Sequence, residues 1–244
     1  MLRAILALLS FAALTAAGNS FSLKEVDGPA AGQAVLLHGL GRSSRSMDRV
    51  AEALHIAGYA VCNVDYPSRD HLIAELVSEH VLPAIHTCGL DVGAPVDFVT
   101  HSMGGIIVRE IAAGAAIPNI GRVVMLAPPN QGSEIVDVLG DNWLFEFVNG
   151  PAGRQLGTEA ESKPNSLGAP KFELGIITGN SSINPLLSNI IPGDDDGKVA
   201  VQRAKVAGMQ DFLILPVSHP FIMRDHVVIR QSLYFLANGK FDQR

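Results

Sequence analysis

Short apolar runs alternate with segments of helical periodicity along this 244-residue chain. The runs that we expect to form strands are 34–37, 59–64, 96–99, 122–126, 174–177 and 212–215. Strands that alternate with amphipathic helices build a mainly parallel sheet with helices on both faces. The pattern therefore predicts an α/β fold with about six parallel strands, and in such sheets functional residues gather at the carboxyl ends of the strands.

The composition excludes several classes of protein. Hydrophobic residues make up 48% of the chain and charged residues only 17%, whereas a disordered chain has low hydrophobicity and high charge. The net charge is −6 and no stretch is rich in lysine and arginine, so we expect no nucleic-acid partner. An aromatic content of 6% also argues against a surface on which bases stack.

The first residues have the pattern of a secretory signal peptide. Arg3 precedes an apolar run over 4–14, and small residues follow at 15–18. The apolar run is shorter than the roughly 20 residues that cross a bilayer. We expect residues 1–17 to be a signal peptide that is cleaved near Ala17, which leaves 18–244 as a single domain exported to the periplasm or the medium. An uncleaved N-terminal anchor is the alternative.

Cys62 and Cys88 are the two cysteines of the chain. In an oxidising compartment we expect them to form a disulfide. The alternative is a pair of buried free thiols, which pack as small hydrophobic residues. Neither cysteine has the spacing to other ligands that a zinc site needs, so we expect no metal.

The segment 98–106 predicts a nucleophile. It reads Phe-Val-Thr-His-Ser-Met-Gly-Gly-Ile, with a strand, a tight turn and a helix in succession. A serine in such a turn is held with its hydroxyl exposed above the sheet, and small residues beside it allow the strand and the helix to approach. Ser102 is therefore the expected nucleophile, although Thr100 stands where this motif usually has glycine. The alternative is a glycine-rich turn without chemistry.

A serine hydroxyl needs a base that takes its proton. His219 follows the last expected strand directly and is the expected base. His226 competes with it, but that residue falls within the start of the last helix. His101 lies next to the serine in sequence, and we expect it to point elsewhere and to be structural.

The imidazole in turn needs a carboxylate that fixes its tautomer. The acidic run 194–196 follows the fifth expected strand and its loop. Asp196, directly before Gly197, is the preferred residue and Asp195 is the second choice. The alternative is a solvated loop or a cation site.

Backbone N–H groups should stabilise the oxyanion that forms during acyl transfer. We expect them from Met103, at the start of the helix after the serine, and from Leu40, in the loop after the first core strand. A plain glycine turn is the alternative at Leu40, and simple packing is the alternative for the Met103 side chain.

Together these motifs resemble the α/β-hydrolase family, and within it the small lipases and esterases. The residues that carry the resemblance are the loop 37–41, the turn 100–105, the segment 125–133, the segment 196–199 and His219. The resemblance implies a three-layer α/β-hydrolase fold and ester hydrolysis through an acyl-enzyme, without a cofactor.

The region 128–172 interrupts the alternation and is rich in Gly, Asn, Ser and Pro. We expect it to form a lid or cap; the alternative is a surface excursion whose aromatic residues complete the core. Trp143 and Phe147 share a helical face and, with Tyr66, are expected to line an apolar acyl site. Tyr66 precedes Pro67, so a turn position is the alternative for it.

The sequence thus predicts an exported serine hydrolase that cleaves small-molecule or lipid carboxylic esters, with transient contact to a lipid surface. An acyltransferase on the same fold is one alternative. A hydrolase-fold binding protein without activity is another.

Overall fold

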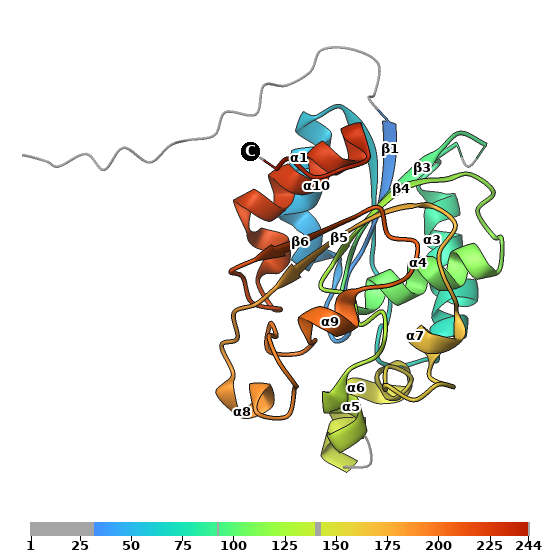
Figure 1. The fold of residues 1–244 in the computed structure, drawn as a ribbon. Coiled ribbons are helices and arrows are strands. Elements are labelled where there is room, and N and C mark those ends of the chain that lie inside the picture. The colour runs from blue at the N-terminus through green and yellow to red at the C-terminus, as the bar shows by residue number, and fades with distance from the viewer. Residues whose placement is uncertain (1–31, 92, 140–142, 244) are drawn as a thin grey trace, which may run out of the picture.

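The computed structural model describes residues 32–91, 93–139 and 143–243, without the side chains of 143–148 (Figure 1). The signal peptide expected over residues 1–17 lies outside the described residues. Within the described part of the chain, no helix is long and apolar enough to cross a membrane.

A sheet of six parallel strands forms the centre of the molecule, as the apolar runs predict. The strands are β1 (Gly32–Leu37), β2 (Tyr59–Val64), β3 (Val96–His101), β4 (Ile120–Leu126), β5 (Glu173–Gly179) and β6 (Asp211–Leu215). Their order is β2-β1-β3-β4-β5-β6. Because all neighbours are parallel, the loops that follow β1, β3, β5 and β6 emerge at the same edge.

Helices cover both faces of the sheet and complete the expected three layers. On one face lie α1 (Asp48–Ile56) and α10 (His226–Asn238), and on the other lie α3 (Leu82–Thr87) and α4 (Met103–Ala113) (Figure 1). Two separate apolar clusters fill the spaces between the layers. Leu54 and Phe235 belong to the first, and Phe98 and Ile106 belong to the second.

The helical periodicity over 72–85 corresponds to three consecutive segments. They are α2 (Ile73–Glu75), the π-helical turn η2 (Leu76–Val81) and α3. The apolar positions Ile73, Leu76, Val81 and Ile85 are all buried against the sheet. The spacing therefore indicates the buried face correctly, but it does not reveal the wider π turn.

A disulfide joins Cys62 in β2 to Cys88 at the end of α3, with 5.8 Å between their Cα atoms. The two residues are 26 positions apart. Since β2 is an edge strand, the bond fastens this edge to the helix that covers it.

The region 128–172 forms short helices beyond the edge where the loops emerge. They are α5 (Glu134–Leu139), α6 (Trp143–Arg154) and α7 (Lys163–Ser166), and the first two protrude at the lower end of Figure 1. The remaining short segments are η1 (Ser44–Met47), α8 (Pro185–Ser188), α9 (Val201–Ala204) and η3 (Ile222–Arg224).

Arg109 of α4 fastens both ends of this region to the body of the molecule. Its guanidinium group donates to the carbonyl oxygens of Asn130 at 3.1 Å, Pro164 at 2.8 Å and Gly168 at 2.8 Å. Burial lowers the pKa of Arg109 to about 10, so the group still carries its charge at neutral pH. Among the residues that the structure describes, carbonyl oxygens and no carboxylate thus compensate the buried cation.

Candidate active site

Ser102 occupies a tight turn between β3 and α4. Its φ of 53° is a strained backbone angle for a residue other than glycine, as expected of a nucleophile in such a turn. The turn is tight because α4 lies directly against β1. A Cβ on Gly104 would come within 2.5 Å of the Leu37 carbonyl oxygen. Thr100, which replaces the usual glycine, is fully buried in β3 and does not prevent the turn.

The structure brings the side chains of Ser102, His219 and Asp196 together. The Ser102 Oγ lies 3.0 Å from Nε2 of His219, and Nδ1 of His219 lies 2.8 Å from Oδ2 of Asp196. The three residues follow β3, β6 and β5, which end at the same edge of the sheet. His226, the competing histidine, begins α10 and does not line this site.

The two candidate aspartates have different partners. Asp196 is fully buried, and its second oxygen, Oδ1, accepts hydrogen bonds from the N–H groups of Lys198 and Val199 at 3.0 and 2.9 Å. Asp195 turns away, and its Oδ1 accepts from the Ser188 hydroxyl at 2.8 Å. The carboxylate that faces His219 is therefore that of Asp196.

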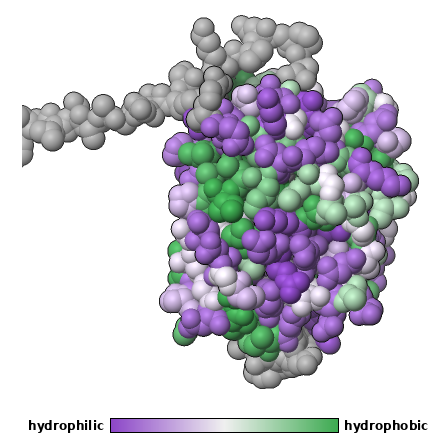
Figure 2. Space-filling view, in the orientation of Figure 1, coloured by the Kyte–Doolittle hydropathy of each residue, from purple (hydrophilic) through white to green (hydrophobic). Residues whose placement is uncertain are grey.

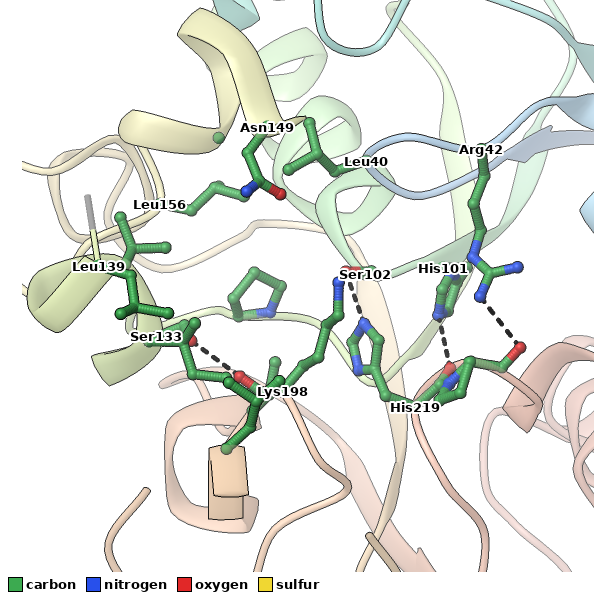
Figure 3. A pocket seen from close by; sticks show the side chains of 17 residues that line it. Leu40, Arg42, His101, Ser102, Ser133, Leu139, Asn149, Leu156, Lys198 and His219 are labelled. Carbon is green, nitrogen blue, oxygen red and sulfur yellow. Dashed lines mark hydrogen bonds between the residues drawn. The ribbon is translucent and has the colours of Figure 1, made fainter. Parts of the chain in front are cut away.

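His101 lies closer to the site than the sequence suggests. Its Nε2 donates to the carbonyl oxygen of His219 at 3.1 Å, and the two rings are 5.0 Å apart (Figure 3). Full burial and the nearby His219 hold the pKa of His101 well below its usual value, so the ring is neutral. The expectation that His101 points elsewhere is wrong, because the ring lines the Ser102 cavity, but its hydrogen bond to the His219 backbone agrees with the expected structural role. Adjacency to Ser102 was the only sequence signal of this contact.

The two expected oxyanion donors lie on adjoining loops. Met103 is the first residue of α4, and the first N–H groups of a helix have no intrahelical acceptor. Leu40 follows β1, and its N–H donates to no group within the described part of the chain. Both N–H groups thus remain available to a bound oxygen atom.

Tyr66 packs against His38, at the start of the loop that contains Leu40. It is buried, its ring stacks on that of His38 at 4.0 Å between centroids, and its hydroxyl donates to the His38 carbonyl oxygen. It does not line the cavity next to Ser102. Trp143 and Phe147 belong to α6, but their side chains lie outside the described residues.

A cavity of about 280 Å³ opens beside Ser102 (Figure 3). Its apolar wall comes largely from the region 128–172 and from the loops that face it. The apolar lining residues are Leu40, Pro129, Ile135, Val136, Leu139, Leu156, Leu187, Val199 and Pro220. The expected lid region therefore lines the cavity, and the apolar wall suits a hydrocarbon chain.

Two cationic side chains, Arg42 and Lys198, also line this cavity. Burial and the proximity of the two charges to each other lower the pKa of Lys198. Burial and the nearby Arg224 lower that of Arg42. No role in the site was expected for either residue, since a lone Arg and a lone Lys in loops carry no recognisable signal.

Within the described residues, one group of side chains has the spacing of a metal site. The candidate ligand atoms of His71, Glu79 and His80 lie within 4.8 Å of one another, and Nε2 of His80 is buried without a hydrogen-bond partner. None of the three lines the Ser102 cavity. This group is therefore separate from the chemistry at the serine.

A hydroxyl, an imidazole and a carboxylate in this arrangement can perform nucleophilic acyl transfer. The imidazole removes the hydroxyl proton, and the carboxylate fixes the tautomer that leaves Nε2 free to accept it. The adjacent N–H groups can stabilise the oxyanion that results from attack on a carbonyl carbon.

Known proteins share the fold of this chain. A search of curated protein sequences gave no match. Among solved structures, a Bacillus licheniformis lipase in its mature form is 18% identical with a TM-score of 0.65, over 86% of this chain and 95% of that chain. A metagenomic carboxyl esterase is 18% identical with a TM-score of 0.61, over 80% of this chain and 66% of that chain.

A monoacylglycerol lipase from Paleococcus ferrophilus is 19% identical with a TM-score of 0.55, over 86% of this chain and 96% of that chain. At these identities the structural likeness concerns the fold. The family model for the alpha/beta hydrolase family matches residues 34–228, which include all six strands except the first two residues of β1. The chain therefore belongs to the alpha/beta hydrolase family.

Proposed function

We propose that this chain is an exported serine hydrolase that cleaves carboxylic esters. The observation that carries the proposal is the continuous hydrogen-bonded series from Ser102 Oγ through His219 to Asp196, at 3.0 and 2.8 Å, beside an apolar cavity. Nucleophile, base and carboxylate have the order and geometry that serine hydrolases use.

In the acylation step, Ser102 Oγ attacks the ester carbonyl carbon while its proton passes to His219 Nε2. The carbonyl oxygen becomes an oxyanion that accepts hydrogen bonds from the N–H groups of Leu40 and Met103. Asp196 stabilises the imidazolium. The C–O bond to the alcohol then breaks, His219 returns the proton to the leaving oxygen, and the acyl group stays on Ser102.

In the deacylation step, a water molecule takes the place of the alcohol. His219 accepts a proton from the water as its oxygen attacks the acyl carbon, and a second oxyanion forms in the same position. The bond to Ser102 breaks, the serine recovers its proton from His219, and the carboxylic acid leaves. The reaction needs no cofactor.

The cavity lining and the surface around it support a lipid-like ester as the substrate. Large apolar side chains are exposed near the lower end of the molecule, at Val138, Ile183 and Leu186 with 61, 63 and 77% of their surface accessible. Green patches mark this end in Figure 2, around α5 and α8. Exposed apolar side chains of this kind suit transient contact with a lipid surface.

The proposed export rests on two features. The sequence over 1–18 has the charge, apolar run and small residues of a signal peptide. Cys62 and Cys88 are paired, as is usual for proteins that fold in oxidising compartments.

The test combines active-site labelling with turnover. A fluorophosphonate should label Ser102, the Ser102→Ala variant should not be labelled, and the wild-type protein should hydrolyse a chain-length series of p-nitrophenyl esters. Added alcohol distinguishes hydrolysis from acyl transfer, because an acyltransferase would form the new ester in preference to the free acid. Labelling of another serine, or no turnover of any ester, would contradict the proposal.

A further inference from the structure

The charged lining of the Ser102 cavity differs from the charge of the whole chain. The chain has a net charge of −6, yet the charged groups that line the cavity, apart from the histidines, are the cations Arg42 and Lys198. No Asp or Glu belongs to the described lining. A cavity with low-dielectric walls and charge of one sign concentrates ligands of the opposite sign.

The backbone of Lys198 is fixed on both sides. Its N–H donates to Oδ1 of Asp196 at 3.0 Å, and its carbonyl oxygen accepts from the Ser133 hydroxyl at 2.8 Å. From this position the side chain extends toward Ser102, as Figure 3 shows. Within the described residues its ammonium group has no hydrogen-bond partner and no ion pair. The cation thus lies beside the proposed reaction centre and remains available to a ligand.

Arg42 lies on the far side of His219 from Lys198 (Figure 3). Its guanidinium group donates to the carbonyl oxygen of Pro220 at 3.2 Å, which holds it next to the histidine loop. Desolvation and the charge of Arg42 lower the pKa of Lys198, and desolvation and the charge of Arg224 lower that of Arg42. An anion next to either cation would offset this lowering, because an opposite charge favours the ionised form of a base.

The position of the cations indicates which part of an ester they would contact. In the proposed mechanism His219 gives its proton to the leaving alcohol, so the alcohol part departs on the side of this residue. The apolar residues Leu139 and Leu156 lie on the other side of Ser102 in Figure 3, where they suit the acyl chain.

We propose that Lys198, with Arg42 as a second cation across His219, binds an anionic group, a phosphate or a carboxylate, on the alcohol part of the ester. This inference rests on the proposed esterase function and adds its substrate class. The preferred substrates are acyl esters of alcohols that carry a phosphate near the scissile bond.

The test compares two esters with the same acyl chain and the same scissile bond, 1-octanoylglycerol and 1-octanoylglycerol 3-phosphate. Both are used below their micelle-forming concentrations, so that single molecules and not surfaces are compared, and octanoate release is measured. We expect kcat/KM for the phosphate ester to be at least about tenfold higher, since charge-assisted hydrogen bonds are stronger than neutral ones. The preference should weaken as salt is added.

Variants assign the preference to the two cations. Lys198→Met should lower the ratio of the two kcat/KM values toward one, Lys198→Glu should invert it, and Arg42→Met should lower it in part. Lys171→Met is the matched control, because Lys171 is exposed just before β5, at the opposite edge of the sheet. Fluorophosphonate labelling of Ser102 shows that each variant is folded.

The outcomes separate this inference from the proposed function. Hydrolysis of both esters at equal kcat/KM by a protein that labels at Ser102 overturns the anion site and leaves the esterase intact. A preference for the phosphate ester that survives in Lys198→Glu also overturns it. Absence of both labelling and hydrolysis contradicts the proposed function itself.

Discussion

At the scale of single residues, the hydrogen-bond partners in the structure distinguish residues of the same type that the sequence presents as equivalent candidates. Asp195 and Asp196 are adjacent and both are mostly or fully buried, yet only Asp196 contacts His219. His101 and His219 contact each other, yet only His219 reaches the Ser102 hydroxyl. Each of these contrasts can be tested with a conservative substitution.

Asp196→Asn should reduce ester hydrolysis by about 10⁴-fold, the loss known for the equivalent change in a serine protease. Asparagine cannot stabilise the imidazolium and can donate its N–H₂ to Nδ1, which leaves His219 in the wrong tautomer. Asp195→Asn should cost far less, because its carboxylate binds the Ser188 hydroxyl instead. The measurement is kcat on a p-nitrophenyl ester, and a severe Asp195→Asn variant with a mild Asp196→Asn variant would reverse the assignment.

The neutral state of His101 predicts a pH dependence of stability. Its pKa in the folded protein lies well below the value of about 6.5 in the unfolded chain. The unfolded state therefore binds more protons as the pH falls below about 6.5, and the stability that is present above this pH is lost. Thermal unfolding at pH 8 and pH 5 should show a smaller loss in His101→Gln than in the wild type. An equal loss in both proteins would mean that His101 is not the group responsible.

At the scale of elements, one helix positions both the proposed nucleophile and the region that lines the cavity. α4 begins directly after Ser102, packs against β1 through Gly104, and carries Arg109, which holds both ends of 128–172. A displacement of this helix would therefore disturb the serine and the cavity wall together.

Gly104→Ala should lower both hydrolysis and stability. The added methyl group would approach the Leu37 carbonyl oxygen to 2.5 Å and the His38 carbonyl oxygen to 3.0 Å, so α4 has to move away from β1. Gly114→Ala, at the other end of the same helix, is the control, because there the nearest atom is 3.6 Å away. Urea unfolding and kcat/KM measure the two effects. A Gly104→Ala protein that matches Gly114→Ala in both would show that the close approach is not required.

Arg109→Leu should destabilise the protein by about 3 kcal/mol, because the buried carbonyl oxygens of Asn130 and Pro164 lose a charged donor. The region 128–172 should also become the first site of cleavage in limited proteolysis. Arg45→Leu, an exposed substitution, should change the free energy of unfolding by less than about 0.5 kcal/mol. If the two variants unfold alike, the guanidinium contacts contribute nothing measurable.

At the scale of the whole molecule, the sequence predicts the sheet well because buried strands are continuous apolar runs. It also predicts which loops approach one another, since strands that are all parallel bring the residues after β3, β5 and β6 to one edge. Ser102, Asp196 and His219 could therefore be predicted from the sequence.

Contacts that depend on the direction of a side chain could not be predicted from the sequence. Tyr66 follows a strand at the correct edge, but its ring turns beneath the Leu40 loop instead of into the cavity. Lys198 is an exposed residue, and its direction toward Ser102 depends on the backbone contacts of its loop, which the sequence does not reveal. Hydrophobic periodicity does not predict the orientation of these two side chains, because both residues lie outside helices and strands.

The disulfide should stabilise the whole domain by about 3 kcal/mol, given that the paired cysteines are 26 residues apart. Denaturant unfolding with and without a reductant measures this contribution. The double variant Cys62→Ser/Cys88→Ser should unfold like the reduced wild type and should not respond to the reductant. Two free thiols on alkylation of the denatured, non-reduced exported protein would contradict the pairing.

The attachment of the region 128–172 has a consequence for protein engineering. Its two ends are held by one arginine on α4, and Ser102, Asp196 and His219 all lie outside it. We therefore expect that other loops can be grafted between Asn130 and Pro164 without moving the sheet, provided that Ser133, which binds the Lys198 carbonyl oxygen, and Glu134, which pairs with Arg203, are kept. If the chain is an esterase, such grafts should change the acyl-chain length that it accepts.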